Sequence, residues 1–286
     1  MTPVYDRVAL IGLGLIASSM FWAMKRAGVA GEVTRYARSQ ETRDTARRIG
    51  LCDRVCDSVI EAVQDADLVV LCVPVGAMGA VAAEISPHLK PGATVSDVGS
   101  VKKSVIETVR PHLPKGVSFV GAHPMAGTEH SGPESGFASL FDNRWCLIVP
   151  DGAPEDATQK LEQFWQALGA NCERMEVEHH DLVCAVVSHI PHLIAYTMVG
   201  VPDDLRPVTD NEAIKFPAAG PRASNRIAAI DPTRWRAVSL TNKQAPPDTL
   251  ARSAADLYPL TAARGAGLGS DLPPDCPGTR PLALPT

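Results

Sequence analysis

The stretch Val8-Ala9-Leu10-Ile11-Gly12-Leu13-Gly14-Leu15-Ile16-Ala17 decides the fold, because a short apolar strand runs directly into a glycine-rich turn. The spacing G-x-G-x-x-A is an accepted form of the dinucleotide-binding fingerprint. Gly12 permits the tight turn, Gly14 lets the backbone approach a pyrophosphate, and Ala17 is small enough for close helix–sheet packing. The start of the following helix then offers N–H groups and a positive dipole end to phosphates. The stretch predicts a nucleotide-binding βαβ unit.

Short apolar runs alternate with helical patterns over the first 150 residues. The pattern predicts strands at 8–11, 33–36, 68–73, 94–97, 119–122 and 146–149, and helices at 18–27, 39–49 and 75–85. Strands that alternate with helices indicate a parallel sheet covered on both faces. We therefore expect an α/β fold whose N-terminal part, residues 1–150, is a Rossmann domain with a doubly wound parallel sheet.

The pattern changes after Pro150. Residues 154–168 have apolar side chains at helical spacing, and the pattern predicts a longer helical region at 178–201. We expect a second, mainly helical domain for substrate binding and dimerisation at 151–272. Residues 273–286 are rich in proline and are predicted to be a disordered tail.

Composition excludes several classes of protein. The formal net charge of the 286 residues is −5, which argues against a nucleic-acid partner. No apolar run approaches the roughly 18 residues that a membrane span needs, and no signal peptide is visible, so a cytoplasmic location is expected. The 7 cysteines include no C-x-x-C pair, which argues against a disulfide framework and against a zinc-site spacing.

The end of the second predicted strand bears on the choice of cofactor. An acidic residue about 20 residues after the fingerprint binds the ribose 2′-hydroxyl of NAD, but this chain has Ala37 there, followed by Arg38 and Ser39. Arg38 can pair with a 2′-phosphate and Ser39 can hydrogen-bond to it. We therefore expect NADP⁺ in preference to NAD⁺, with the use of both left open. The other cofactor contacts are predicted to be Gly12, Gly14, Leu15, Ile16, Ala17, Val73, Pro74 and Ser100.

Four further segments follow in order along the chain. They read Asp97-Val98-Gly99-Ser100-Val101-Lys102, His123-Pro124-Met125-Ala126-Gly127-Thr128-Glu129, Ser188-His189-Ile190-Pro191-His192, and Asn225-Arg226-Ile227-Ala228 with Asp231-Pro232-Thr233-Arg234-Trp235-Arg236. With the fingerprint, they make roughly residues 7–245 resemble the prephenate/arogenate dehydrogenase family, which includes the cyclohexadienyl dehydrogenases of tyrosine biosynthesis.

The resemblance implies an oxidative decarboxylation of prephenate, arogenate or both. A hydride leaves the ring carbon that bears the 4-hydroxyl, the ring carboxylate departs as CO₂, and the ring becomes aromatic. This reaction needs a base near the 4-hydroxyl, and a neutral histidine suits that task near pH 7. By resemblance His123 is the catalytic base, and Ser100 is its hydrogen-bonding partner beside the nicotinamide.

The substrate carries two negative charges, so the resemblance also implies cationic or polar partners. Arg226 matches the substrate-binding arginine of the family, and arginine binds carboxylates bidentately. His189 and His192 share a helix face and are similar to the substrate-side histidines of the family. His180 matches another, although simple helical counting puts it on a different face. Trp235 resembles an aromatic residue near the site, with a core role equally open, and Thr128 and Glu129 are expected to support or gate it.

The sequence departs from the family pattern near Arg226. The family has a run with aromatic and acidic residues there, but this chain reads Gly220-Pro221-Arg222-Ala223-Ser224. The later helices that usually build the homodimer correspond here to proline-rich sequence, so we expect a weakened dimer. An alternative is a catalytically impaired relative that still binds nucleotide. A β-hydroxyacid dehydrogenase is a third reading, but it would need a catalytic lysine between residues 178 and 201, where there is none.

Overall fold

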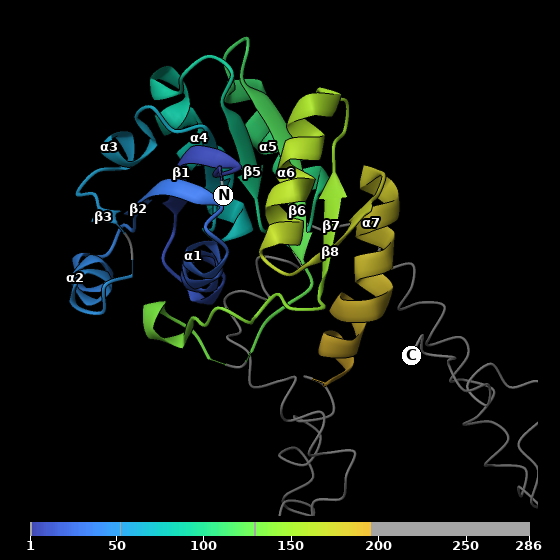
Figure 1. Cartoon of the computed structure of the whole chain (residues 1–286). Helices are drawn as coiled ribbons and strands as arrows, with labels where there is room; N and C mark the ends of the chain where they lie inside the picture. The colour runs from blue at the N-terminus through green and yellow to red at the C-terminus, as the bar shows by residue number, and fades with distance from the viewer. Residues whose placement is uncertain (1, 52, 129, 196–286) are drawn as a thin grey trace, which may run out of the picture.

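The computed structural model describes residues 2–51, 53–128 and 130–195 (Figure 1). Three predicted site residues, Glu129, Arg226 and Trp235, lie outside these ranges, as does the predicted tail at 273–286. The homodimer contacts expected from the C-terminal third lie outside them as well.

One sheet organises the described part of the chain. Its strand order is β3-β2-β1-β4-β5-β6-β7-β8, and neighbouring strands are parallel except for β6 and β7, which are antiparallel. The strands are β1 (Tyr5–Ile11), β2 (Ala30–Tyr36), β3 (Arg54–Val55), β4 (Leu68–Leu71), β5 (Thr94–Asp97), β6 (Ser118–Pro124), β7 (Trp145–Val149) and β8 (Asn171–Arg174).

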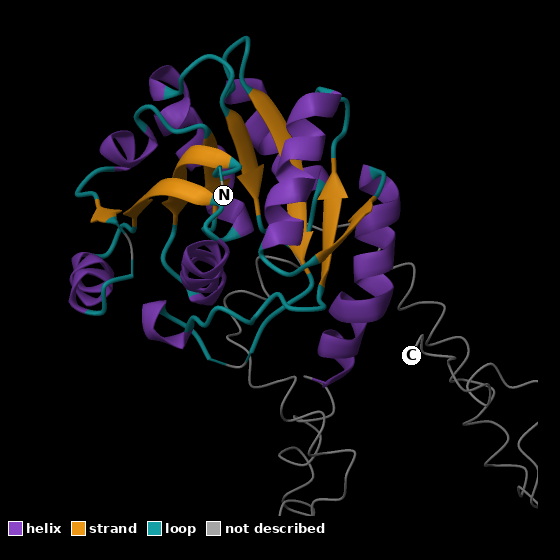
Figure 2. Cartoon of the chain, in the orientation of Figure 1, coloured by secondary structure: helices purple, strands orange, loops and turns teal. Residues whose placement is uncertain are grey.

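Helices cover both faces of this sheet (Figure 2). They are α1 (Leu15–Ala27), α2 (Gln40–Arg48), α3 (Val59–Val63), α4 (Val75–Ile85), α5 (Lys103–Val109), α6 (Glu155–Ala167) and α7 (Val177–Cys184), with short 3₁₀ segments at Ser86–His88, Arg110–His112 and Pro133–Ser135 and a π-helical segment at Ala185–His189. In β1, Val8 and Leu10 join one core with α1 and α6, while Ala9 and Ile11 join the other with α3, α4 and α5. This alternation is what a sheet buried on both faces requires, and it confirms the predicted fold class.

The sheet extends beyond residue 150, where the sequence pattern puts the domain boundary. Helix α6 packs into the same core as α1, and β8 pairs with β7. Strand β8 has no buried residue, so it lacks the apolar run that marks a strand in the sequence. The change to helical structure therefore comes after Arg174 in the described residues.

The two halves of the sheet diverge between β1 and β4, since the chain passes from β1 outward to β2 and β3 and then returns to β4. In open α/β sheets the ligand crevice lies at such a point, outside the carboxyl ends of the strands. Within the described residues, no helix is long and apolar enough to cross a membrane.

Candidate active site

A cavity of about 340 Å³ opens at this point of the sheet. Four segments line it: residues 14–17 at the start of α1, residues 72–75 after β4, residues 98–100 after β5, and the end of β6 with the loop that follows it. Gly14, Leu15, Ile16, Ala17, Val73, Pro74, Ser100, His123 and Thr128 all belong to the lining. The structure thus brings together most of the predicted cofactor residues, the predicted base and its predicted partner.

The glycine turn has the geometry of a phosphate-binding loop. Gly12 has a φ of 109°, and a Cβ atom there would lie 2.5 Å from the carbonyl oxygen of Cys72, so no larger residue fits without moving the backbone. Gly14 is the N-cap residue of α1 and supplies no side-chain cap. The first N–H groups of α1 are therefore suited to a bound anion at the cavity wall.

Arg38 and Ser39 lie apart from this lining. Ser39 is the N-cap residue of α2, and its hydroxyl oxygen accepts a hydrogen bond of 3.4 Å from the N–H of Thr42. The Arg38 side chain is exposed. Both residues follow β2, next to β1 in the sheet, and a direct cofactor contact by either stays a prediction.

A buried ion pair joins the segments that carry Ser100 and His123. The Asp97 carboxylate pairs with the Lys102 ammonium, and both side chains are fully buried. Lys102 Nζ also donates to the carbonyl oxygen of Ala122 over 2.8 Å, and Asp97 accepts from the N–H groups of Gly99 (2.8 Å) and Ala122 (3.3 Å). Because a buried ion pair that is fully hydrogen-bonded tolerates little movement, it fixes the loop after β5 against the end of β6.

His123 stands at the end of β6 and contacts helix α7 behind it. Its Nδ1 lies 3.0 Å from Nε2 of His180, whose Nδ1 lies 2.8 Å from Oδ1 of Asp181. Asp181 is in turn held by the backbone N–H groups of Lys102 (2.7 Å) and Lys103 (3.1 Å). The two imidazole rings meet edge to face, with centroids 5.1 Å apart.

Charge and hydrogen bonding fix the tautomers of His123 and His180. Burial raises the pKa of Asp181, but hydrogen bonds from His180 and the two backbone amides outweigh it, so the pKa is lowered and the group is a carboxylate that only accepts. His180 must then carry its proton on Nδ1, which leaves Nε2 as an acceptor for Nδ1–H of His123. Burial, followed by the neighbouring His180 and Lys102, lowers the pKa of His123 well below its ordinary value. Neutral His123 therefore has its lone pair on Nε2, the ring nitrogen that His180 does not contact.

The helix that carries the later histidines is irregular. The π-helical segment Ala185–His189 follows α7 directly, and such segments often occur at functional sites. His189 is buried and hydrogen-bonds to the backbone of Ser100, and burial lowers its pKa to about 4. His192 is half-buried and its Nδ1 lies 2.7 Å from the carbonyl oxygen of Ser188.

His180 is fully buried and engages His123 and Asp181 through its two ring nitrogens. Its predicted contact with a substrate stays a prediction. Asp97, Lys102, Asp181 and Cys184 were not predicted from the sequence as functional residues. Asp97 and Lys102 stand in the quoted D-V-G-S-V-K segment, and a charged pair around the end of an apolar strand was the available signal.

Comparison with known proteins agrees with this geometry. Residues 22–174 match the family model for the nucleotide-binding domain of prephenate dehydrogenase, and residues 176–263 match the model for its dimerization domain. The chain is 40% identical over 261 residues to a cyclohexadienyl dehydrogenase of Zymomonas mobilis, covering 91% of this chain and 89% of that protein. The chain belongs to the prephenate dehydrogenase family. The resemblance seen in the sequence is thereby confirmed.

Two other members of this family show how far the likeness extends. A prephenate dehydrogenase of Bacillus subtilis is 31% identical over 85% of this chain, which spans 66% of that protein. The crystal structure of prephenate dehydrogenase from Aquifex aeolicus, in complex with hydroxyphenyl propionate and NAD⁺, is 30% identical and superposes with a TM-score of 0.82 over 91% of each chain.

Proposed function

We propose that this chain is an NAD(P)-dependent dehydrogenase that oxidatively decarboxylates prephenate, arogenate or both, with His123 as the base. The observation that carries the proposal is the position of His123. It lines the same cavity as the fingerprint helix, and the contact with His180 directs its lone pair to Nε2. The family of the chain and the activities named for its relatives support the same reaction.

The residues present fit a dinucleotide. The uncapped start of α1 would hold the pyrophosphate, while the segment after β4 and Ser100 would flank the nicotinamide end of the same cavity. When bound, NAD(P)⁺ supplies the hydride acceptor. The protein positions this acceptor against the substrate and keeps water from the reacting carbon.

His123 removes the proton from the 4-hydroxyl of the substrate. Loss of that proton drives hydride departure, and the loss of CO₂ makes the ring aromatic. His123 becomes an imidazolium, and the negative charge of Asp181 lies two hydrogen bonds away through His180. Asp181 and His180 therefore both fix the tautomer of the base and stabilise the positive charge that His123 acquires, as the aspartate of a catalytic triad does.

The remaining substrate contacts are carried forward as proposals. Arg226 and His192 would bind the carboxylates, and Thr128, which lines the cavity, would act with Glu129 and Trp235 near the entrance. His189, which hydrogen-bonds to the backbone of Ser100, would take part with His192 on the substrate side. The preference for NADP⁺ rests on Arg38 and Ser39 and on the missing acidic residue after β2.

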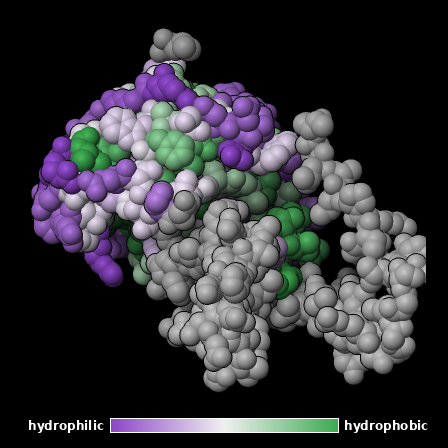
Figure 3. Space-filling model, turned by 90° about the horizontal axis from the view of Figure 1, so that it is seen from below, coloured by the Kyte–Doolittle hydropathy of each residue, from purple (hydrophilic) through white to green (hydrophobic). Residues whose placement is uncertain are grey.

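The homodimer is proposed on two grounds. The model that matches residues 176–263 describes a dimerization domain. Figure 3 shows a mixed surface with apolar residues in several places, and among the exposed apolar residues are Leu182, Val186, Val187 and Ile194 of α7 and its continuation. The 11 prolines after residue 216 motivate a weaker dimer than usual. Sedimentation velocity tests this, and a tight dimer at nanomolar concentration contradicts the weakened interface.

The activity is tested by absorbance at 340 nm with prephenate and then arogenate, each with NAD⁺ and with NADP⁺. Reduction of the cofactor with at least one pair is the expected result. No turnover with any of the four pairs, with cofactor binding intact by calorimetry, contradicts the proposal and favours the impaired relative.

A further inference from the structure

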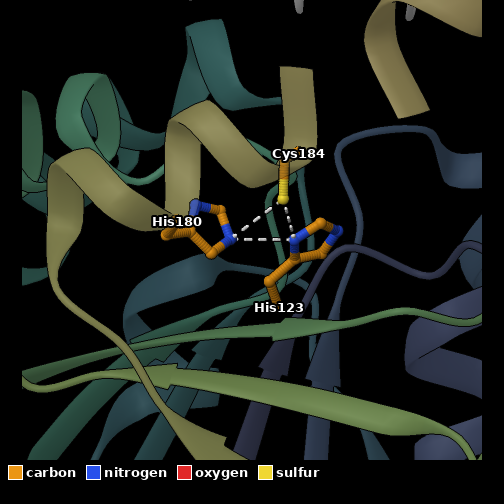
Figure 4. Close-up of side chains that lie close together, drawn as sticks. All are labelled: His123, His180 and Cys184. Atoms are coloured by element: carbon orange, nitrogen blue, oxygen red, sulfur yellow. Dashed lines mark hydrogen bonds between the residues drawn. The ribbon is translucent and has the colours of Figure 1, made fainter. Parts of the chain in front are cut away.

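Cys184 brings a third donor atom to the contact between His123 and His180. Its Sγ lies 3.5 Å from Nδ1 of His123 and 3.5 Å from Nε2 of His180, and the two nitrogens are 3.0 Å apart. Figure 4 shows the three atoms at the corners of a small triangle between α7 and the end of β6. All three residues are buried, and each offers one ligand atom within 4.8 Å of the other two.

These distances match three corners of a tetrahedral metal site. With Zn–N bonds of about 2.05 Å and Zn–S bonds of about 2.3 Å, tetrahedral angles put two nitrogens about 3.3 Å apart and a nitrogen and a sulfur about 3.6 Å apart. The observed separations differ from these values by 0.3 Å and 0.1 Å, so the side chains need only small shifts to ligate an ion. One thiolate and two imidazoles suit a borderline-soft cation better than Mg²⁺ or Ca²⁺.

The surroundings prepare the site electrostatically. Asp181 accepts the Nδ1 proton of His180, the arrangement that orients metal-binding histidines and makes the other nitrogen a better donor. The charge of Asp181 and a thiolate at Cys184 together would balance a divalent cation. The Lys102 ammonium nearby opposes the cation, but it is paired with Asp97.

We propose that Cys184, His123 and His180 form a site for a thiophilic divalent cation of the Zn²⁺ class, and that binding of this ion inhibits the enzyme. The Cys184 thiol loses its proton to solvent and its sulfur bonds to the metal. His123 bonds through Nδ1, so its single proton moves to Nε2, and water completes the coordination. Neutral His123 then has no lone pair on Nε2 and is no longer a base. The inhibitory part of this inference rests on the proposed function, while the binding part does not.

Burial sets the cost of binding, because it raises the pKa of Cys184 to about 12. The metal must displace that proton, so one proton is released for each ion bound. The cysteines lack a zinc-site spacing, and His123 is 57 residues from His180 along the chain. The three ligands meet only through the packing of α7 on β6.

The test uses the full chain without a histidine tag, freed of metal by a chelator. Co²⁺ is the spectroscopic probe, and the expected result is one ion per chain, a sulfur-to-cobalt charge-transfer band, and displacement by Zn²⁺. Cys184→Ser and Cys184→Ala should abolish the band and weaken binding by more than the roughly 10–100-fold that loss of an outer partner costs. Two matched controls, Cys172→Ser on β8 and His179→Gln beside His180, should keep the charge-transfer band and the affinity for the ion.

The absence of a charge-transfer band in the parent protein, or an unchanged band in both Cys184 variants, overturns the metal site. Zn²⁺ inhibition is then measured for each variant against its own rate without metal. Loss of inhibition in the Cys184 variants supports the proposal. Stoichiometric binding through Cys184 without inhibition overturns the inhibitory part and leaves the metal site standing. Failure of the proposed function is instead the absence of turnover in metal-free protein with every substrate and cofactor pair, so the two failures are distinguishable.

Discussion

The two halves of the cavity use different kinds of chemical groups. The half formed by β1 and α1 offers a glycine turn, backbone N–H groups and a small alanine. The half formed by the ends of β5 and β6 offers Ser100 and His123. Behind it, buried hydrogen bonds join Asp97 to Lys102, and join His123 through His180 to Asp181. Binding a phosphate needs only a backbone shape, whereas moving a proton needs side chains with fixed protonation states.

The largest expected effect is on the catalytic half. His123→Ala removes the base, so kcat should fall by about 10²–10⁴-fold, the usual contribution of a general base. Cofactor affinity should stay unchanged, because the start of α1 is untouched. Steady-state kinetics with calorimetry of cofactor binding checks this, and a kcat within about threefold of the parent would show that the base is another group.

The ion pair should control stability. Lys102→Met leaves the Asp97 carboxylate buried without its partner, which costs about 3–5 kcal/mol of unfolding free energy. Replacing both charges, in Lys102→Met with Asp97→Asn, should recover much of that loss. Urea unfolding measures both variants, and equal losses in the single and double variants would mean that the charge pair is not the cause.

Acid should destabilise the catalytic half through His189. Burial holds its pKa at about 4 in the folded chain, against 6.5 when exposed, so the unfolded state takes up a proton first as the pH falls. The stability from this group is complete above about pH 6.5 and is lost between about pH 6.5 and 4, by up to about 3 kcal/mol. His189→Gln should flatten that part of the profile in thermal unfolding measured across pH. An unchanged acid limb would rule out His189 as its source.

The smallest effect should fall on the cofactor half. Arg38→Ala should lower kcat/KM for NADP⁺ by about 10-fold, the loss of one charge-assisted contact of about 1.4 kcal/mol. Values for NAD⁺ should barely change, which serves as the internal control. Equal losses of kcat/KM with both cofactors would mean that Arg38 does not bind the 2′-phosphate.

The difference between the halves also explains what the sequence could predict. The fingerprint and the strand β1 were predicted because their signals are local: the glycine spacing and the apolar run lie within ten residues. Helix α4 was predicted with its observed bounds, Val75–Ile85. Strands β3 and β8 were missed, because one is two residues long and the other has no buried residue.

The contacts of His180 could not be predicted from the spacing of residues along the sequence. Its partner His123 is 57 residues away, and their meeting depends on how α7 packs against β6. Counting along a regular helix also fails after Cys184, because the π-helical segment Ala185–His189 changes the angular position of each later residue. The sequence predicted a set of candidate site histidines, but not the contact between His123 and His180.

The protonation state of His123 tests the central claim most directly. Nitrogen-15 NMR of histidine-labelled protein, assigned with His123→Gln, reports which ring nitrogen carries the proton. The account predicts a neutral ring near pH 7 with the proton on Nδ1 and the lone pair on Nε2, and loss of this preference in Asp181→Asn. A proton on Nε2 of His123 in the parent protein would contradict the account.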